Sequence, residues 1–440
     1  MSIYGALNTA ISGLTAQASA FANISDNVAN AQTVGFKRVD TSFVDFLTTS
    51  SNIVNDPGAV VARPDYANTV QGTITQTDKP LNMAIAGQGF FTVSEPIGNV
   101  TSGVTTFSPQ PFYTRAGDFA TNKEGYLVNS AGLYLNGWPV DPTTGAVNQN
   151  VLQPIQVTQT VFNPVATSSV QLNANLPATP AAGTATLAAP LSSAINVYDA
   201  LGTVHPVSLD WVQNAPGDWT VNIASSSLTP AAIGSAEVTF GAASGNPVPA
   251  GTIGQIFNTT GAVSAAGYAP GTSADMTFTV DFGSGPQTID LGMGTYGVAN
   301  GVTQYAGTTY SLAGLTQNGV PPGSFSSLIT QADGSVIVNY NNGQSRTIAQ
   351  VPITTFNAAD QLQRQNGQAF TATLNSGNPI AEIANTNGAG TIVVSSTEGS
   401  NVDIASEFSQ LIVAQQAYSA NAKMVTTANQ LLTTTIDMKQ

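Results

Sequence analysis

The chain has 440 residues, enough for two or three domains that each bury a core of their own. It carries 10 basic and 24 acidic residues, for a formal net charge of −14, with no Cys and a single His, His205. The acidic balance argues against a nucleic-acid partner, and the lack of Cys with one His argues against disulfides, thiolate chemistry and a His-based metal site or catalytic triad.

Only 8% of the residues are charged, against about a quarter in typical globular domains. The polar surface must therefore consist mostly of Thr, Asn, Ser and Gln, with 42 Gly and 24 Pro to form turns. This composition is typical of a turn-rich β-protein outside the cell. It also suits surfaces that bury against copies of themselves, because uncharged polar groups cost less to desolvate than ions.

The N-terminal segment predicts a helix over residues 1–30. Its apolar positions alternate in steps of three and four residues, which is a heptad pattern. The seam consists of Tyr4, Leu7, Ile11, Leu14, Ala18, Phe21, Ser25 and Val28. The first Lys is Lys37, so the start lacks the basic region of a signal peptide, and no apolar run is long enough for a membrane span. We expect export without a cleaved signal peptide and no membrane insertion.

The middle of the chain predicts short strands separated by turns. Residues 31–71 are interpreted as a connector that includes Asp56-Pro57-Gly58. Strands then follow in an inner β-domain, 72–165 and 302–401, with turn signals at Asp333-Gly334 and Asn342-Gly343. Residues 166–301 have a strand series of their own and are interpreted as an inserted outer β-domain.

The C-terminal segment, 402–440, predicts a second helix with the same spacing. Ser400 and Asp403 are interpreted as a capping-box-like start. An ordinary amphipathic helix docked on its own domain is the alternative to a coiled-coil-like pair of the two ends. The seam consists of Ile404, Phe408, Leu411, Gln415, Tyr418, Ala422, Val425, Asn429, Leu432 and Ile436.

The predicted fold class is therefore mainly β with long α-helical termini. Two nested β-domains, the outer one inserted in the inner one, accompany a coiled-coil-like pair of the N- and C-terminal helices. Because a lone pair of such helices is marginal in water, we expect the ends to become ordered when neighbouring subunits cover their remaining faces.

Four segments together resemble the bacterial flagellar rod, hook and hook-associated axial proteins. They are NISDNVANAQTVGFKR at 23–38, LNMAIAGQGFF at 81–91, YTRAGDF at 113–119 and SNVDIASEFSQLIVAQQAYSANAKM at 400–424. Within this family, the length and a VYDALGTVH segment at 197–205 fit the hook proteins best. The motif residues are Gly35, Phe36, Gly87, Gly89, Phe90, Phe91, Tyr113, Arg115 and Gly117.

The resemblance implies a structural subunit that polymerises with itself into a curved, flexible tube, and neither an enzyme nor a cofactor-binding protein. It also implies an extracellular place in the flagellum, with contacts to the export apparatus and to distal rod, hook cap, hook-length control and hook–filament junction proteins. The residues expected to mediate polymerisation are Leu7, Ile11, Leu14, Phe21, Val28, Ile404, Phe408, Leu411, Tyr418, Val425, Leu432 and Ile436.

Other interpretations stay open at this point. Gly87-Gln88-Gly89 fits a tight β-turn better than a nucleotide loop, because it lacks a third Gly and a following helix. Arg115 either binds an anion or pairs structurally beside Tyr113 and Asp118, and His205 is interpreted as a surface or turn residue. A distal rod or junction protein, a secreted adhesin and a cell-wall hydrolase are the alternative functions, although no catalytic, cofactor or metal site stands out.

Overall fold

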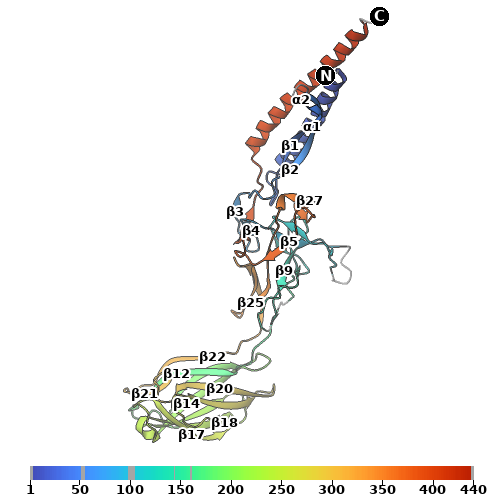
Figure 1. Ribbon diagram of the computed structural model, residues 1–440. Helices are drawn as coiled ribbons and strands as arrows, with labels where there is room; N and C mark the ends of the chain where they lie inside the picture. The colour runs from blue at the N-terminus through green and yellow to red at the C-terminus, as the bar shows by residue number, and fades with distance from the viewer. Residues whose placement is uncertain (1–2, 51–54, 98–104, 143, 159–160, 438–440) are drawn as a thin grey trace. The chain divides into compact units, whose positions relative to one another are not determined.

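The computed structural model describes residues 3–50, 55–97, 105–142, 144–158 and 161–437. The described chain is mostly β, with α1 (Ile3–Ala29) and α2 (Ile404–Asp437) near its two ends, as predicted (Figure 1). It divides into two compact units. Unit 1 comprises residues 1–158, 326–339 and 345–440, and unit 2 comprises residues 159–325 and 340–344. The four predicted domains stay a prediction.

Unit 2 consists mainly of two sheets that share one apolar core. The first has the order β18-β19-β20-β12-β21, with β22 also on β12, and the second has the order β13-β14-β15-β16-β17. The first sheet comprises β12 (Ser169–Pro177), β18 (Val263–Ala265), β19 (Ser273–Asp281), β20 (Pro286–Thr295), β21 (Val302–Tyr305) and β22 (Ser311–Gln317). The second comprises β13 (Leu191–Tyr198), β14 (Val204–Ala215), β15 (Asp218–Ser225), β16 (Ala232–Phe240) and β17 (Ile253–Gly261). A 3-10 turn, η1 (Gly241–Ser244), follows β16, and β11 (Val161–Phe162) pairs with the start of β23 (Gly323–Thr330).

Side chains that alternate along the strands explain this core. In β15, Trp219, Val221 and Ile223 point inward and are buried, whereas the residues between them are partly exposed. Trp211 on β14 is fully buried in the same cluster. Residues 124–345, which include all of unit 2, contain neither Lys nor Arg. The stability of unit 2 therefore depends on apolar packing and on polar contacts without basic side chains other than His205.

His205 corrects a prediction. It lies within β14 rather than at the surface or in a turn, and only 9% of it is exposed. Its ring stacks on Phe282 with centroids 3.9 Å apart, and its Nε2 lies 3.4 Å from Oδ2 of Asp199. The adjacent Pro206 was the reason for expecting a turn. The strand accepts this proline because Pro206 pairs only with β13, at Asn196, and lies before Val207, where the pairing of β14 with β15 begins.

The largest sheet of unit 1 includes the order β24-β25-β9-β5-β6-β28-β27. These strands are β5 (Phe91–Ser94), β6 (Phe112–Thr114), β9 (Tyr134–Pro139), β24 (Ser335–Tyr340), β25 (Ser345–Gln350), β27 (Gln363–Gln365) and β28 (Ala369–Thr371). Short strands β7 (Ala120–Thr121), β8 (Leu127–Val128) and β10 (Gln153–Pro154) join this sheet at its side, and β23 pairs with β24. A 3-10 turn, η2 (Ala359–Gln361), precedes β27.

Three two-stranded sheets in unit 1 join early residues to late ones or close its loops. They pair β3 (Ile74–Gln76) with β31 (Ser396–Glu398), β4 (Met83–Ala86) with β30 (Thr391–Val394), and β26 (Ile353–Thr355) with β29 (Ile380–Glu382). The first two pairs bring the chain segments that leave α1 and enter α2 to the same place, which positions the site described below.

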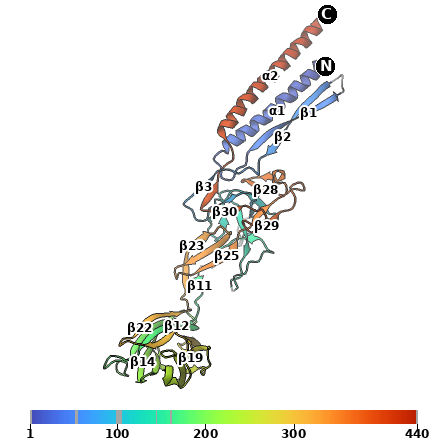
Figure 2. The same cartoon turned by 60° about the vertical axis from the view of Figure 1, so that its left-hand side comes forward.

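A long hairpin occupies most of the predicted connector. Strands β1 (Val39–Ser50) and β2 (Asn55–Tyr66) pair antiparallel, with register shifts near Phe46 and Leu47. The hairpin lies along α1 (Figure 2). Several polar contacts join it to that helix. Among them, Asn23 Nδ2 donates to Thr41 Oγ1 at 2.8 Å, and Val60 N donates to Ser12 Oγ at 3.1 Å.

Candidate assembly site: the terminal helix pair and its ionic joint

Helix α1 packs closely on α2 through small residues. Ala16 and Ala20 of α1 and Ala414 and Ala428 of α2 are all buried. At Gly13, an added Cβ would lie 2.9 Å from Nδ2 of Asn421, so a larger side chain would push the helices apart. The ring centroids of Phe21 and Tyr418 lie 6.2 Å apart in an edge-on contact across the pair. Small residues therefore set the distance between the helices.

The register of α2 differs in part from the predicted seam. Leu411, Tyr418, Val425 and Leu432 face α1 or are half-buried, as the spacing indicated. The alternate seam positions are shifted by one residue, because Glu407, Ala414, Asn421 and Ala428 face inward, whereas Phe408, Gln415 and Asn429 are exposed and Ala422 is half-buried. Two of the four inward residues are alanines, which allow a close contact.

The same shift leaves large apolar side chains of α2 uncovered. Between 46% and 66% of each is exposed. They are Ile404, Phe408, Ile412, Val413, Met424, Leu431 and Ile436. In α1, Tyr4 and Ile11 are also exposed, whereas Leu7, Leu14, Phe21 and Val28 are half-buried. An apolar surface of this kind marks a place where another surface binds.

The buried side chains of Asn27 and Glu407 join the end of α1 and the start of α2 to the hairpin. Asn27 accepts a hydrogen bond from Val39 N at 2.9 Å and donates one to Val39 O at 3.0 Å. Its Nδ2 also donates to Oε1 of Glu407 at 3.2 Å. The other oxygen of Glu407 has no hydrogen-bond partner among the described residues, and only 1% of the residue is exposed.

The surroundings of Glu407 disfavour its ionised form. Burial raises its pKa above the ordinary value of 4.5, and the charges of Asp40 and Asp403 act in the same direction. The hydrogen bond from Asn27 and the charge of Arg38 oppose this shift without cancelling it. The first turn of α2 therefore contains a carboxyl group that packs best when protonated.

The start of α2 also corrects a prediction. Asp403 is the N-cap itself, because its Oδ1 accepts hydrogen bonds from Ala405 N at 2.9 Å and Ser406 N at 3.2 Å. Ser400 lies before the helix, where its Oγ accepts a hydrogen bond from Val402 N at 3.3 Å. The capping box was therefore placed three residues too early.

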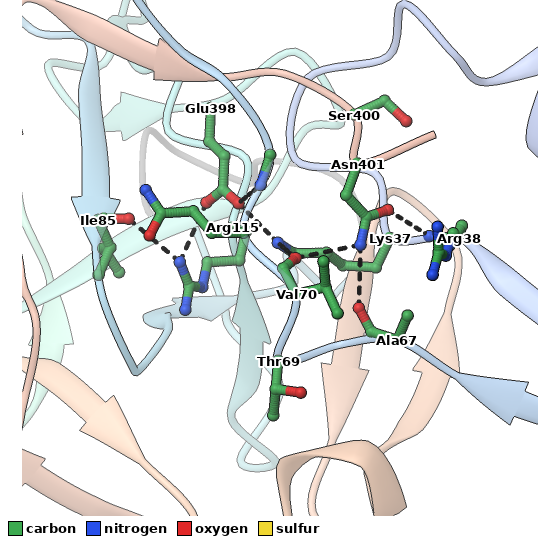
Figure 3. A network of polar contacts seen from close by, with 12 residues as sticks. Lys37, Arg38, Ala67, Thr69, Val70, Ile85, Arg115, Glu398, Ser400 and Asn401 are labelled. Atoms are coloured by element: carbon green, nitrogen blue, oxygen red, sulfur yellow. Dashed lines mark hydrogen bonds and ion pairs between the residues drawn. The ribbon is translucent and has the colours of Figure 1, made fainter. Parts of the chain in front are cut away.

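Below the helices, three buried charged residues form an ionic joint (Figure 3). Oε1 of Glu398 lies 2.6 Å from Nζ of Lys37, and its Oε2 lies 3.1 Å from Nη1 of Arg115. The side chains of all three are at most 1% exposed. Lys37 follows α1, Arg115 follows β6 and Glu398 ends β31, so one carboxylate links three distant parts of unit 1.

Backbone carbonyls accept further hydrogen bonds from the two cations, although Nε of Arg115 has no partner among the described residues. Lys37 Nζ donates to Val70 O at 2.6 Å, and Arg115 donates to Ile85 O at 3.1 Å and Gly87 O at 2.7 Å. Burial lowers the pKa of both Lys37 and Arg115, and the charge of Glu398 opposes that shift. Removing one partner of such a pair typically costs about 3–5 kcal/mol, because a buried charge is left uncompensated.

Asn401 extends this joint toward α2. Its Oδ1 accepts a hydrogen bond from Arg38 N at 2.7 Å, and its Nδ2 donates to Ala67 O at 3.0 Å and Val70 O at 3.1 Å. The residues before α2 are thereby fixed to the segments that flank the hairpin (Figure 3). The joint holds the base of the helix pair on the β-structure of unit 1.

The predicted motif residues lie around the joint. Gly35 has a φ of +69°, and an added Cβ would lie 2.4 Å from Ala116 N, while one on Gly117 would lie 1.7 Å from Met83 O. Gly87 and Gly89 both have positive φ and form the turn between β4 and β5. The aromatic members Phe36, Phe90, Phe91 and Tyr113 are all buried, and burial raises the pKa of Tyr113 to about 12.

Sequence reasoning missed Glu398 and gave Arg115 the wrong neighbour. Asp118 accepts a hydrogen bond from Ser130 N at 3.4 Å, and the ion pair of Arg115 is with Glu398 instead. No local signal pointed to Glu398, because it lies 361 residues from Lys37 along the chain.

The part of the chain that the structure describes contains no group of three His, Asp or Glu side chains that could hold a metal ion. Neither of its helices is long and apolar enough to cross a membrane.

Four family models match successive parts of the chain. They are Flagella basal body rod protein at residues 7–37, Flagellar hook protein FlgE/F/G D1 domain at 84–175, Flagellar basal body protein FlaE D2 domain at 168–320, and Flagellar basal body rod FlgEFG protein C-terminal at 394–438. The ionic joint draws Lys37 from the first match, Arg115 from the second and Glu398 from the fourth.

Relatives match over their whole length. The chain is 29% identical to the flagellar hook protein FlgE of Brucella abortus, with 100% of each chain covered. It is 29% identical to that of Escherichia coli strain K12, covering 99% of this chain and 100% of the relative. A crystal structure of the Helicobacter pylori flagellar hook protein FlgE2 aligns with a TM-score of 0.47 and 14% identity, covering 72% of this chain and 98% of that one.

Proposed function

Because the chain belongs to the bacterial flagellar hook protein family, we propose that it is the structural subunit of the flagellar hook. Many copies polymerise into a curved, flexible tube that transmits torque from the motor to the filament. The family is a structural one and not an enzyme family.

The uncovered apolar side chains of α2 carry this proposal. Phe408, Ile412 and Val413 are each more than half exposed, and they lie to either side of the face that packs on α1. Burying apolar surface contributes about 25 cal/mol per Å², so neighbouring copies that cover these side chains would stabilise the helix pair and the polymer together. A secreted adhesin or a wall hydrolase has no use for such a surface.

The same proposal extends to domain organisation. Residues 1–30 and 402–440 act as a coiled-coil-like polymerisation domain, and 31–71 connect it to the rest. Residues 72–165 and 302–401 form an inner β-domain into which an outer domain, 166–301, is inserted. Unit 2 consists mainly of residues 159–325 and has parts of unit 1 before and after it in the sequence, which supports this nesting.

The hook subunit works outside the cell. It leaves through the flagellar export apparatus without a cleaved signal peptide. Its partners other than itself are the distal rod, the hook cap, the hook-length control protein and the hook–filament junction proteins. The full-length match to hook proteins supports this place in the flagellum.

Electron microscopy of the purified chain under polymerising conditions tests the proposal. We expect curved tubes from the full chain, and soluble monomers that form no tubes from chains lacking 1–30 or 402–440. Circular dichroism should show that β-structure persists in both truncated chains. Tubes formed by either truncated chain would contradict the role of the helices, and straight tubes from the full chain would favour a distal rod subunit.

A further inference from the structure

A polar groove of about 600 Å³ runs beside α1 within unit 1. Its walls come from α1, from the hairpin and from the end of β27. The hydrogen-bonding side chains that line it are Ser19, Asn23, Asp26, Arg63, Tyr66, Arg364, Gln365 and Asn366. The groove lies apart from the uncovered apolar side chains of α2, because no residue of α2 lines it.

Two guanidinium groups line this groove, on the hairpin and on β27. Arg63 is exposed, and among the described residues it has neither an ion pair nor a side-chain hydrogen bond. The guanidinium of Arg364 stacks on the ring of Phe36, with its Cζ 4.8 Å from the ring centroid. Stacking of this kind leaves the N–H groups at the edge of the guanidinium free to donate.

The groove has little negative charge of its own to meet these donors. Its one carboxylate, Asp26, attracts Arg364 electrostatically but makes no ion pair within 4.0 Å among the described residues, and its Oδ1 accepts a hydrogen bond from Asn30 Nδ2 at 2.9 Å. By contrast, Lys37, Arg38 and Arg115 all pair with carboxylates of their own chain. Arg63 and Arg364 are therefore available to an anion from outside.

The chemistry of the groove suits an oxyanion such as a carboxylate. A guanidinium donates two parallel hydrogen bonds to a carboxylate, and the neighbouring amides and hydroxyls can satisfy further oxygens. The chain has 24 acidic residues and 10 basic ones, so a second copy offers many carboxylates and few competing cations. In a homopolymer, copies are also the ligand present at the highest local concentration.

We infer that the groove lined by Arg63 and Arg364 binds a carboxylate-bearing surface of a second copy of this chain. The inference rests on the proposed function, because it assumes that copies pack side by side. It assigns a polar contact to the assembly, in addition to the contacts proposed for the uncovered apolar side chains of α2.

A pair of charge variants tests the groove. Arg63→Gln/Arg364→Gln should raise the critical concentration for tube formation at low salt by about tenfold, because ion pairs at interfaces are worth on the order of 1.4 kcal/mol or more. The matched control, Lys79→Gln/Lys123→Gln, removes the same charge from exposed sites of unit 1 and should leave it unchanged. Equal critical concentrations for the two double variants would overturn the inference.

A zero-length crosslink identifies the partner directly. In an Arg63→Lys chain, a carbodiimide joins residue 63 to any carboxylate in contact with it. Tubes made from a mixture of isotopically light and heavy chains should give crosslinked peptides that combine both labels at residue 63. Crosslinks confined to one chain, for example to Asp26, would overturn the inference. A wild-type chain that forms no tubes would instead remove the proposed function, and the inference with it.

Discussion

Unit 2 and the terminal helix pair achieve order in opposite ways. Unit 2 places its largest apolar side chains inward, and Trp211 and Trp219 are fully buried between two sheets. The helix pair places Ala and Gly at its contact and turns Phe408 and Ile412 outward. Unit 2 therefore covers its own large apolar side chains, whereas the helix pair leaves several of them exposed.

The largest expected effect lies in unit 2. Trp219→Ala removes a fully buried indole and should lower the free energy of unfolding of unit 2 by about 4 kcal/mol. Hydrogen exchange read by mass spectrometry should show lost protection in unit 2 and unchanged protection in α1 and α2. Leu187→Ala, at a side chain that is 81% exposed, is the control. Loss of protection in the helices would show that the two regions are not independent.

The ionic joint should come next. Glu398→Gln leaves Lys37 and Arg115 buried without an anion and should lower the free energy of unfolding of unit 1 by about 3 kcal/mol. Urea denaturation followed at Trp138, which is buried in unit 1, measures this loss. The exposed Glu95→Gln is the matched control. Adding Lys37→Met should return part of the loss, and no recovery would mean that packing rather than charge explains it.

A smaller effect should depend on pH at Glu407. Its pKa in the folded chain is above 4.5, so the folded chain binds this proton more tightly than the unfolded chain. The stability from protonation is complete below pH 4.5 and is lost as the pH rises through the folded pKa. Relative to Glu407→Gln, the wild-type chain should therefore lose hydrogen-exchange protection of α2 as the pH rises. The free energy lost should be smaller than the loss that Glu398→Gln causes. Parallel pH profiles would contradict this prediction.

The smallest effect on the monomer should come from replacing an uncovered apolar side chain of α2. Phe408→Ser changes a side chain that is 52% exposed, so the free energy of unfolding of the monomer should move by at most about 0.5 kcal/mol. Tube formation, measured by sedimentation, should nevertheless be lost. Gln415→Ser, at an exposed polar position of the same helix, is the control. Normal tubes from Phe408→Ser would show that this uncovered apolar side chain takes no part in the assembly.

Local patterns were enough to predict the helices and the β-rich middle. The spacing from Leu7 to Val28 and from Leu411 to Leu432 placed helices near both ends, and the structure confirms them. Half of the α2 seam was misplaced by one residue, because apolar spacing alone does not show which residues the partner helix covers. Pattern therefore indicates which segment is helical more reliably than which side faces inward.

Long-range contacts were beyond local patterns. Glu398 and Lys37 are 361 residues apart, and nothing near either residue names the other. The hairpin of β1 and β2 was interpreted as a connector because of the turn signal Asp56-Pro57-Gly58, which lies inside β2, and proline usually argues against a strand. Its partner, α1, supplies the contacts that hold it.

The lack of Lys and Arg between Lys123 and Arg346 has a practical consequence for digestion. Proteases of the trypsin type cleave after basic residues, so all their sites lie in unit 1. Even fully unfolded, residues 124–346 would survive such an enzyme as one piece. Trypsin therefore becomes a probe whose every cleavage reports on unit 1.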